Sequence, residues 1–165
     1  MSALAEFRLI STAKLQNLVE AAEVKIQKGF FTKKTIDNFH AVILHDTKKL
    51  IDFNWSGFIL ADLLIFLQEK RNINLFEGEY NAIADQIIER RQQSPIILTY
   101  EHTLKYASSL IPEKFSTNEL IEFNKDFSEN DDPQIATAQL EGIAALKQSL
   151  DSIPSSNFAV LLFIG

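Results

Sequence analysis

The sequence contains no cysteine, which excludes disulfide bonds, thiolate nucleophiles and cysteine-ligated zinc. It also contains no GxGxxG, Walker A, GxSxG, HExxH or EF-hand pattern, so the common nucleotide, hydrolase, zinc-protease and calcium motifs are absent. The most apolar internal run, residues 58–67, is too short to span a bilayer and includes Asp62. We therefore predict neither a cofactor nor a metal site.

The composition is that of a globular protein. The chain has 165 residues, of which 46% are hydrophobic and 23% charged, and this suits a single domain with a sizeable core, residues 1–165. A net charge of −6 argues against nucleic acid or an anionic membrane as the main partner. The N-terminus lacks a basic region followed by an apolar segment, so we expect no signal peptide and a cytoplasmic location.

Three segments have strand patterns. Residues 158–165 are apolar at every position except Gly165, which is typical of an interior strand covered on both faces. Residues 4–10 alternate between apolar and polar side chains, and residues 96–98 form a short apolar run. The two terminal strands and residues 96–98 are therefore expected to share one small sheet.

Apolar residues at spacings of three and four predict the helices. We expect them over residues 15–26, 35–43, 55–69, 79–93 and 99–110, and after the capping signals at Ser116 and Asp132. The third is apolar nearly all round, so its large side chains Trp55, Phe58, Leu63 and Phe66 should be buried. The predicted fold class is α+β: a small sheet including the N- and C-terminal strands, packed by about six helices.

Three parts of the chain resemble one protein family. They are residues 5–11, an opening strand that passes into a helix; residues 52–58, with an aspartate and a tryptophan at a helix start; and the C-terminal part from residue 98 to Phe163-Ile164-Gly165. Together they resemble the YfbM-like family of small bacterial α+β proteins of unknown function. Members usually carry a histidine four residues after the tryptophan, where this chain has Ile59. The resemblance implies a fold, and a fold does not imply a function.

One candidate binding surface is an acidic stretch with interleaved aromatic residues. Its charges could attract a basic protein partner and Phe127 could anchor it, whereas the ordinary alternative is a solvated loop and helix face. The candidate residues are Glu119, Glu122, Asp126, Phe127, Glu129, Asp131 and Asp132.

A second candidate is a pocket near Asp52, Trp55 and His102. It would place an oriented aspartate and a titratable histidine beside an aromatic side chain; the alternative is a helix-entry aspartate, a core tryptophan and a surface histidine. His40 and His45 are five residues apart and do not share a helical face, unlike the pair of a zinc-binding helix.

These features support two functional hypotheses. The first is a non-enzymatic cytoplasmic protein-binding domain with no nucleic-acid or membrane partner, of which an immunity-type protein that neutralises a toxin domain is one version. The alternative is a small-molecule-binding or enzymatic domain that uses the pocket near Asp52, Trp55 and His102. A deep cleft with converging titratable groups would favour the second, and a flat acidic patch with apolar islands the first. The oligomeric state is left open.

Overall fold

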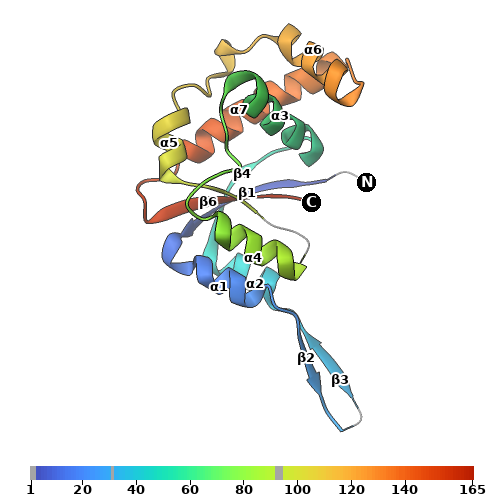
Figure 1. Ribbon diagram of the computed structural model, residues 1–165, viewed down its shortest axis with the longest axis vertical. Helices are drawn as coiled ribbons and strands as arrows, with labels where there is room; N and C mark the ends of the chain where they lie inside the picture. Colours follow the sequence, from blue (N-terminus) through green and yellow to red (C-terminus); the bar gives the residue numbers. More distant parts are fainter. Residues whose placement is uncertain (1–2, 31, 92–94) are drawn as a thin grey trace.

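A four-stranded antiparallel sheet lies at the centre of the computed structural model, which describes residues 3–30, 32–91 and 95–165 (Figure 1). Its order is β4-β1-β6-β5, so the two terminal strands lie side by side in its middle. The predicted α+β fold with both terminal strands in one sheet is confirmed. The strands are β1 (Ala5–Ser11), β4 (Thr47–Asp52), β5 (Ile96–Leu98) and β6 (Phe158–Ile164).

Strand β6 is the interior strand that its uniform apolar sequence predicts. It pairs with β1 over its whole length and with β5 on its other side. Val160 and Leu162 belong to the hydrophobic cluster on one face of the sheet, and Ala159, Leu161 and Phe163 to the cluster on the other. Because both faces are covered by helices, the strand has no polar face and its sequence does not alternate.

Helices cover both faces of the sheet (Figure 1). The larger layer holds the main core, and its longest helix, α7, contacts α3, α5 and α6. A smaller layer of three helices covers the opposite face. The larger layer contains α3 (Gly57–Arg71), α5 (Tyr100–Tyr106), the 3-10 turn η2 (Pro112–Lys114), α6 (Thr117–Ser128) and α7 (Pro133–Asp151); the smaller contains η1 (Thr12–Lys14), α1 (Leu15–Ala21), α2 (Phe39–Asp46) and α4 (Asn81–Arg91).

The helix starts of the C-terminal half lie where the capping signals predict. The Thr99 hydroxyl accepts a hydrogen bond from the backbone N–H of His102 at the start of α5. Ser116 and Glu119 form a reciprocal capping box at the start of α6. The Asp132 carboxylate accepts the N–H of Gln134, and Pro133 occupies the first turn of α7. These local bonds satisfy backbone donors that a helix end leaves open.

Helix α3 is less uniformly buried than its sequence predicts. Leu63 and Phe66 are buried, as expected, but Phe58 is 60% exposed, so that prediction is wrong. Trp55 precedes the helix and is half-buried, and its indole N–H donates to Glu141 Oε2 at 2.7 Å. The helix packs on α7 and α6 from one side, so its outward face leaves an apolar side chain in water.

The interpretation of residues 22–54 is also corrected. Helix α1 ends at Ala21 and α2 begins at Phe39. Two strands lie between them, β2 (Lys25–Lys28) and β3 (Lys33–Ile36), in place of the predicted end of one helix, a connection and the predicted start of the next helix. Strand β4 lies between two predicted helices, where no strand is predicted, and forms an edge of the sheet. Phe31 and the predicted end of the fourth helix at Gln93 lie outside the described residues. No helix in the described ranges is long and apolar enough to cross a membrane.

Candidate functional site

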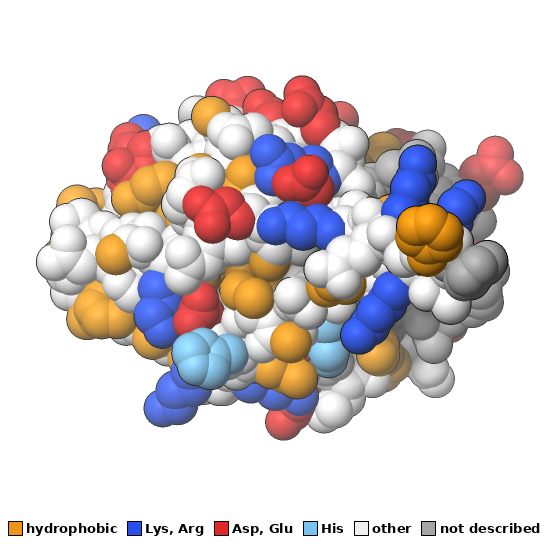
Figure 2. Space-filling model, turned by 90° about the horizontal axis from the view of Figure 1, so that it is seen from below, with side chains coloured by type: hydrophobic (Ala, Val, Ile, Leu, Met, Phe, Trp, Pro, Cys, Tyr) orange, Lys and Arg blue, Asp and Glu red, His pale blue; other side chains and the backbone are white. Residues whose placement is uncertain are grey.

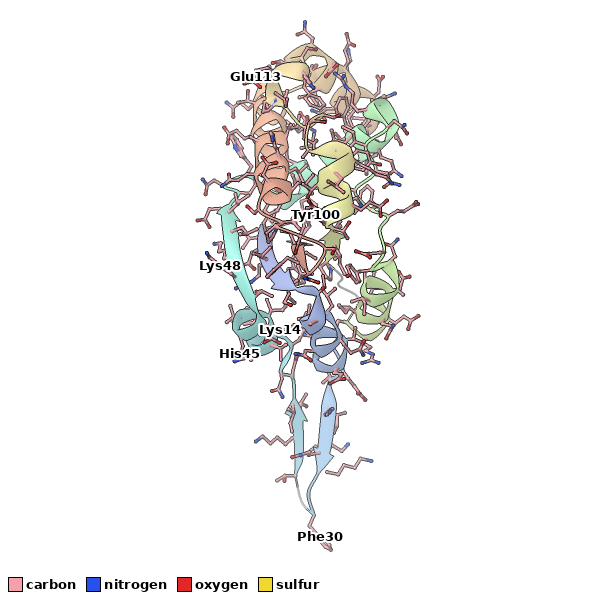
Figure 3. The ribbon with its side chains drawn as sticks, turned by 90° about the vertical axis from the view of Figure 1, so that its left-hand side faces the viewer. Lys14, Phe30, His45, Lys48, Tyr100 and Glu113 are labelled. Atoms are coloured by element: carbon pink, nitrogen blue, oxygen red, sulfur yellow. The ribbon has the colours of Figure 1, made fainter. Side chains whose placement is uncertain are left out.

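A β-hairpin formed by β2 and β3 projects from the body of the molecule (Figures 1 and 3). We call residues 25–36 the arm. All four residues of β2 are exposed, and in β3 only Ile36 is half-buried. Phe30 lies at the tip with 99% of its surface exposed, and Ile26 is 63% exposed. The arm therefore presents apolar side chains to solvent rather than to a core of its own.

The strand register of the arm places two lysines directly opposite each other. The pairs are Lys25 with Ile36, Ile26 with Thr35, Gln27 with Lys34, and Lys28 with Lys33. The turn is closed by a 2.7 Å hydrogen bond from the N–H of Gly29 to the carbonyl of Thr32. Like charges directly opposite one another destabilise an antiparallel pair, so the contact next to the turn works against the hairpin.

The charge of the arm is opposite to that of the body. Residues 25–36 contain four lysines and no acidic residue, which gives the arm +4. The whole chain carries −6, so the residues outside the arm together carry −10. Figure 2 views the molecule from this end and shows Lys and Arg side chains on the right-hand side of this face as well as across its centre and left. The arm is thus a basic, aromatic-tipped extension of an acidic domain.

Two polar contacts brace the root of the arm. The first holds Asp37, which follows β3, to helix α4. The Arg91 guanidinium donates two hydrogen bonds of 2.8 Å to the Asp37 carboxylate and lies 4.5 Å from the centre of the Phe39 ring. This pairing holds the pKa of Asp37 below its ordinary value. The bidentate geometry fixes the direction in which β3 leaves the body.

The second contact joins α1 to the C-terminal end of α2. Asp46 accepts hydrogen bonds from Asn17 at 3.0 Å, Lys14 at 2.9 Å and His45 at 2.8 Å. These donors, the Asn17 amide foremost, hold the pKa of Asp46 far below its ordinary value. Figure 3 places Lys14 and His45 at the base of the arm. A shallow hollow of about 310 Å³ lies between this network and the arm, with Lys25 and Ile36 among its lining residues.

The acidic face lies at the end of the molecule opposite Phe30, near the labelled Glu113 (Figure 3). We define it as the seven candidate residues of α6 and the α6–α7 connection, Glu119 to Asp132. Two of them have local structural roles, since Glu119 closes the α6 capping box and pairs with Arg71, and Asp132 caps α7. The others are exposed: Glu122, Asp126, Phe127, Glu129 and Asp131.

A groove of about 430 Å³ runs beside the acidic face. Phe66 and Phe123 form its aromatic lining, and Glu122 and Asp126 lie opposite Lys70 and Arg71 along it. Phe127 is 45% exposed and stacks on Phe123 with ring centroids 5.1 Å apart. The basic residues of α3 partly neutralise the groove, so its net field is weaker than the acidic stretch alone suggests.

Asp62 lies half-buried on α3. Burial raises the pKa of its carboxyl, and a hydrogen bond from the Ser128 hydroxyl opposes that rise. The partner belongs to α6, so Asp62 helps to join the two helices.

Asp52, Trp55 and His102 contact three different sets of partners. Asp52 forms an ion pair with Lys49, and Trp55 donates to Glu141. His102 is 3% exposed. Its Nδ1 accepts the Thr99 N–H at 3.0 Å and its Nε2 donates to the Glu77 carbonyl at 2.8 Å. Burial lowers the pKa of His102. Both ring nitrogens thus hold backbone groups, which gives this histidine a structural role.

The other histidines are at the surface. His40 and His45 are both exposed, and His45 contacts Asp46. Across residues 3–30, 32–91 and 95–165, no group of three or more His, Asp or Glu side chains is placed to hold a metal ion.

Sequence reasoning missed the arm, although a signal for it exists. Residues 25–28 and 32–36 are short runs that contain the β-branched residues Ile26, Thr32, Thr35 and Ile36, separated by a turn that contains Gly29. Two such runs around a glycine-containing turn of a few residues indicate a β-hairpin. The spacing of Ala22 and Ile26 also fits a helix, but Ala22 follows the last residue of α1 and Ile26 lies in β2.

Comparisons with protein-family models, with curated proteins and with solved structures gave no significant match. The YfbM-like resemblance is therefore neither supported nor contradicted by them and stays a prediction.

Proposed function

We propose that this protein is a non-enzymatic protein-binding domain and that the arm is its principal binding element. The observation that carries the proposal is the 99% exposure of Phe30 at the end of a projecting hairpin. Aromatic side chains dominate the energy of many protein interfaces because they bury a large rigid surface at small entropic cost. A phenylalanine held away from the body can enter a partner's pocket without a clash between the two bodies.

The energetics of the arm support the proposal that it binds a partner. An isolated two-stranded hairpin is marginal in water. This one exposes Ile26 and Phe30 and opposes Lys28 to Lys33. Burying one phenylalanine side chain stabilises a complex by about 1.5–3 kcal/mol before the costs of association. A partner that covers Ile26 and Phe30 and places negative charge near Lys28 and Lys33 would therefore offset both unfavourable features, the exposed apolar side chains and the opposed lysines.

The braced root reduces the cost of ordering the arm on binding. Arg91 and Asp37 fix β3, and the Asp46 network fixes the platform from which the arm leaves. A binding element that is ordered beforehand loses less conformational entropy in the complex.

A cytoplasmic immunity-type protein, which would insert the arm into a toxin domain, remains the concrete version that we propose. The acidic face is a second candidate surface, for a basic partner, since Phe127 is exposed beside four carboxylates with no capping role. The enzymatic alternative has less support, because His102 is occupied by two backbone groups and contacts neither Asp52 nor Trp55 in its hydrogen bonds.

Site-specific photo-crosslinking in native host cells tests the proposal. A photoreactive phenylalanine analogue would replace Phe30, Phe127 or, as a control on α5, Leu104, which is 70% exposed. We expect one defined protein adduct from position 30 and none from position 104. An adduct from position 127 alone would move the binding site to the acidic face, and positions 30 and 127 giving no more adduct than position 104 would refute protein binding through either surface.

A further inference from the structure

The four lysines of the arm are divided equally between its two faces. Side chains directly opposite each other in an antiparallel pair lie on the same face, and faces alternate along each strand. The register therefore puts Lys25 and Lys34 on one face and Lys28 and Lys33 on the other. Phe30 lies beyond both pairs, at the tip. Positive charge thus surrounds the arm rather than marking one side of it.

This distribution fits a concave partner. A flat acidic surface meets one face of a hairpin and leaves the other pair of lysines in water. A cleft meets both faces at once and can hold the tip at its floor. Opposite charges across such an interface raise the association rate and fix the register of binding.

We infer that the arm docks into a carboxylate-lined cleft of another protein, with Phe30 in an apolar pocket at its floor and the two lysine pairs against its walls. This inference rests on the proposed function and names the chemistry of the partner. Clefts of this kind are common in hydrolases that use carboxylate pairs or carboxylate-bound metal ions. Insertion of the arm would block such a site.

Nucleic acid fits the same charges less well. Each strand of the arm has four residues, and at about 3.3 Å per residue it spans roughly 13 Å. A duplex long enough to bind would extend past the arm and meet a body that carries −10. Duplex DNA carries a charge about every 1.7 Å, so this repulsion grows with each turn of the duplex beyond the arm. A cleft in a protein needs to approach only the arm.

A second copy of this chain is a weaker candidate. Two arms repel each other, because each carries +4 and lysines on a strand edge oppose edge-to-edge pairing. The acidic groove of another copy is partly neutralised by Lys70 and Arg71. Self-association through these surfaces is therefore an outcome that the experiment must detect.

The test uses the full chain with two probes, poly-L-glutamate and a DNA duplex of equal total charge, followed by the backbone amide signals in NMR titrations at low and high salt. We expect poly-L-glutamate to shift the signals of residues 25–36 and to bind more tightly than DNA. The signal shifts and the affinity for poly-L-glutamate should both decrease as salt screens the charges. The double variants Lys25→Gln/Lys34→Gln and Lys28→Gln/Lys33→Gln should each weaken binding, roughly threefold to tenfold at low salt. The matched control Lys48→Gln/Lys49→Gln removes two exposed lysines from strand β4 and should change the affinity less than twofold.

Lys28→Glu separates binding from folding. It turns the opposed lysines into a Glu–Lys pair, which should slow amide exchange in the arm while it weakens poly-L-glutamate binding. A loss of binding caused by an unfolded arm would instead come with faster exchange.

Three results of the titrations would overturn the inference: tighter binding of DNA than of poly-L-glutamate, weaker binding in only one of the two lysine double variants, or unshifted signals of residues 25–36. Sedimentation of the parent chain provides a fourth: self-association with rising concentration that is lost in the lysine double variants and in Glu129→Gln/Asp131→Asn would mean that the arm docks on the acidic face of a second copy. An adduct from position 30 in the crosslinking experiment with an unshifted arm here would leave the proposed function intact and reject only the acidic cleft. Failure of the crosslink at every position would reject the proposed function itself.

Discussion

Phe66 and Phe58 offer a matched test of how α3 packs. They share a residue type and a helix, yet Phe66 is 2% exposed and Phe58 60% exposed. Phe66 contacts the rings of Phe123 and Phe115, with centroids 5.2 and 6.3 Å away. Truncating a buried phenylalanine to alanine costs about 3–5 kcal/mol, and loss of favourable ring pairs contributes about 0.5–1.5 kcal/mol of interaction beyond area burial.

We expect Phe66→Ala to lower the free energy of unfolding by about 3–4 kcal/mol, towards the lower end because the ring borders an open groove that water can fill. Phe58→Ala should cost less than about 1 kcal/mol, because full burial of the ring is worth only about 1.5–3 kcal/mol and most of it is already in water. Urea denaturation followed by far-UV circular dichroism measures both, with an unchanged denaturant slope as the check on two-state unfolding. Equal losses in the two variants, or a loss below about 1 kcal/mol for Phe66→Ala, would mean that α3 presents a different face to the core.

Three further predictions concern polar groups. Asn124 and Gln139 are fully buried and exchange two amide hydrogen bonds of 2.9 and 2.8 Å. Asn124→Leu should therefore lower the free energy of unfolding by about 1–3 kcal/mol in urea denaturation. The double variant with Gln139→Leu should lose less stability than the sum of the two single variants. The folded-state pKa of His102 lies below its ordinary value of 6.5, so the neutral histidine contributes its full stabilisation above about pH 6.5 and this contribution is lost as the pH falls below that value. The midpoint of urea denaturation should therefore be lower at about pH 5 than at about pH 7, and the difference should be smaller in His102→Gln. On the acidic face, Glu129→Gln with Asp131→Asn should leave the free energy of unfolding within about 0.5 kcal/mol of the parent. Asp132→Ala should cost about 1 kcal/mol and Asp132→Asn almost nothing, since asparagine caps a helix as well as aspartate does. Thermal denaturation in which Asp132→Asn loses as much stability as Asp132→Ala would contradict the capping role.

The parts of the fold that sequence reasoning finds are those where one local signal is strong. Strand β6 is apolar at every position because it is covered on both sides, and no helix-like period competes with that reading. The starts of α5, α6 and α7 follow side-chain caps that act over three residues. Such signals need no knowledge of tertiary contacts.

The parts that it misses depend on which surfaces lie near one another. Phe58 is as apolar as Phe66, and only the position of α6 and α7 decides which ring is buried. Strand β4 resembles a connection because it is an edge strand with Lys48 and Lys49 on it. The acidic face is likewise visible as composition, but the capping roles of Glu119 and Asp132 follow from helix ends.

The arm was missed for a reason that also bears on its role. A strand is normally recognised because one of its faces is apolar and meets a core, whereas every residue of the two arm strands except the half-buried Ile36 is exposed. Its sequence also acts against its own fold at Lys28 and Lys33. Natural sequences are mostly consistent from local preference to global fold, and departures are expected at functional sites. A lysine pair that weakens the free hairpin and an aromatic tip that faces water both become favourable only when an acidic, concave surface closes around them. The stability of the arm and its affinity for such a partner therefore depend in opposite directions on the same side chains.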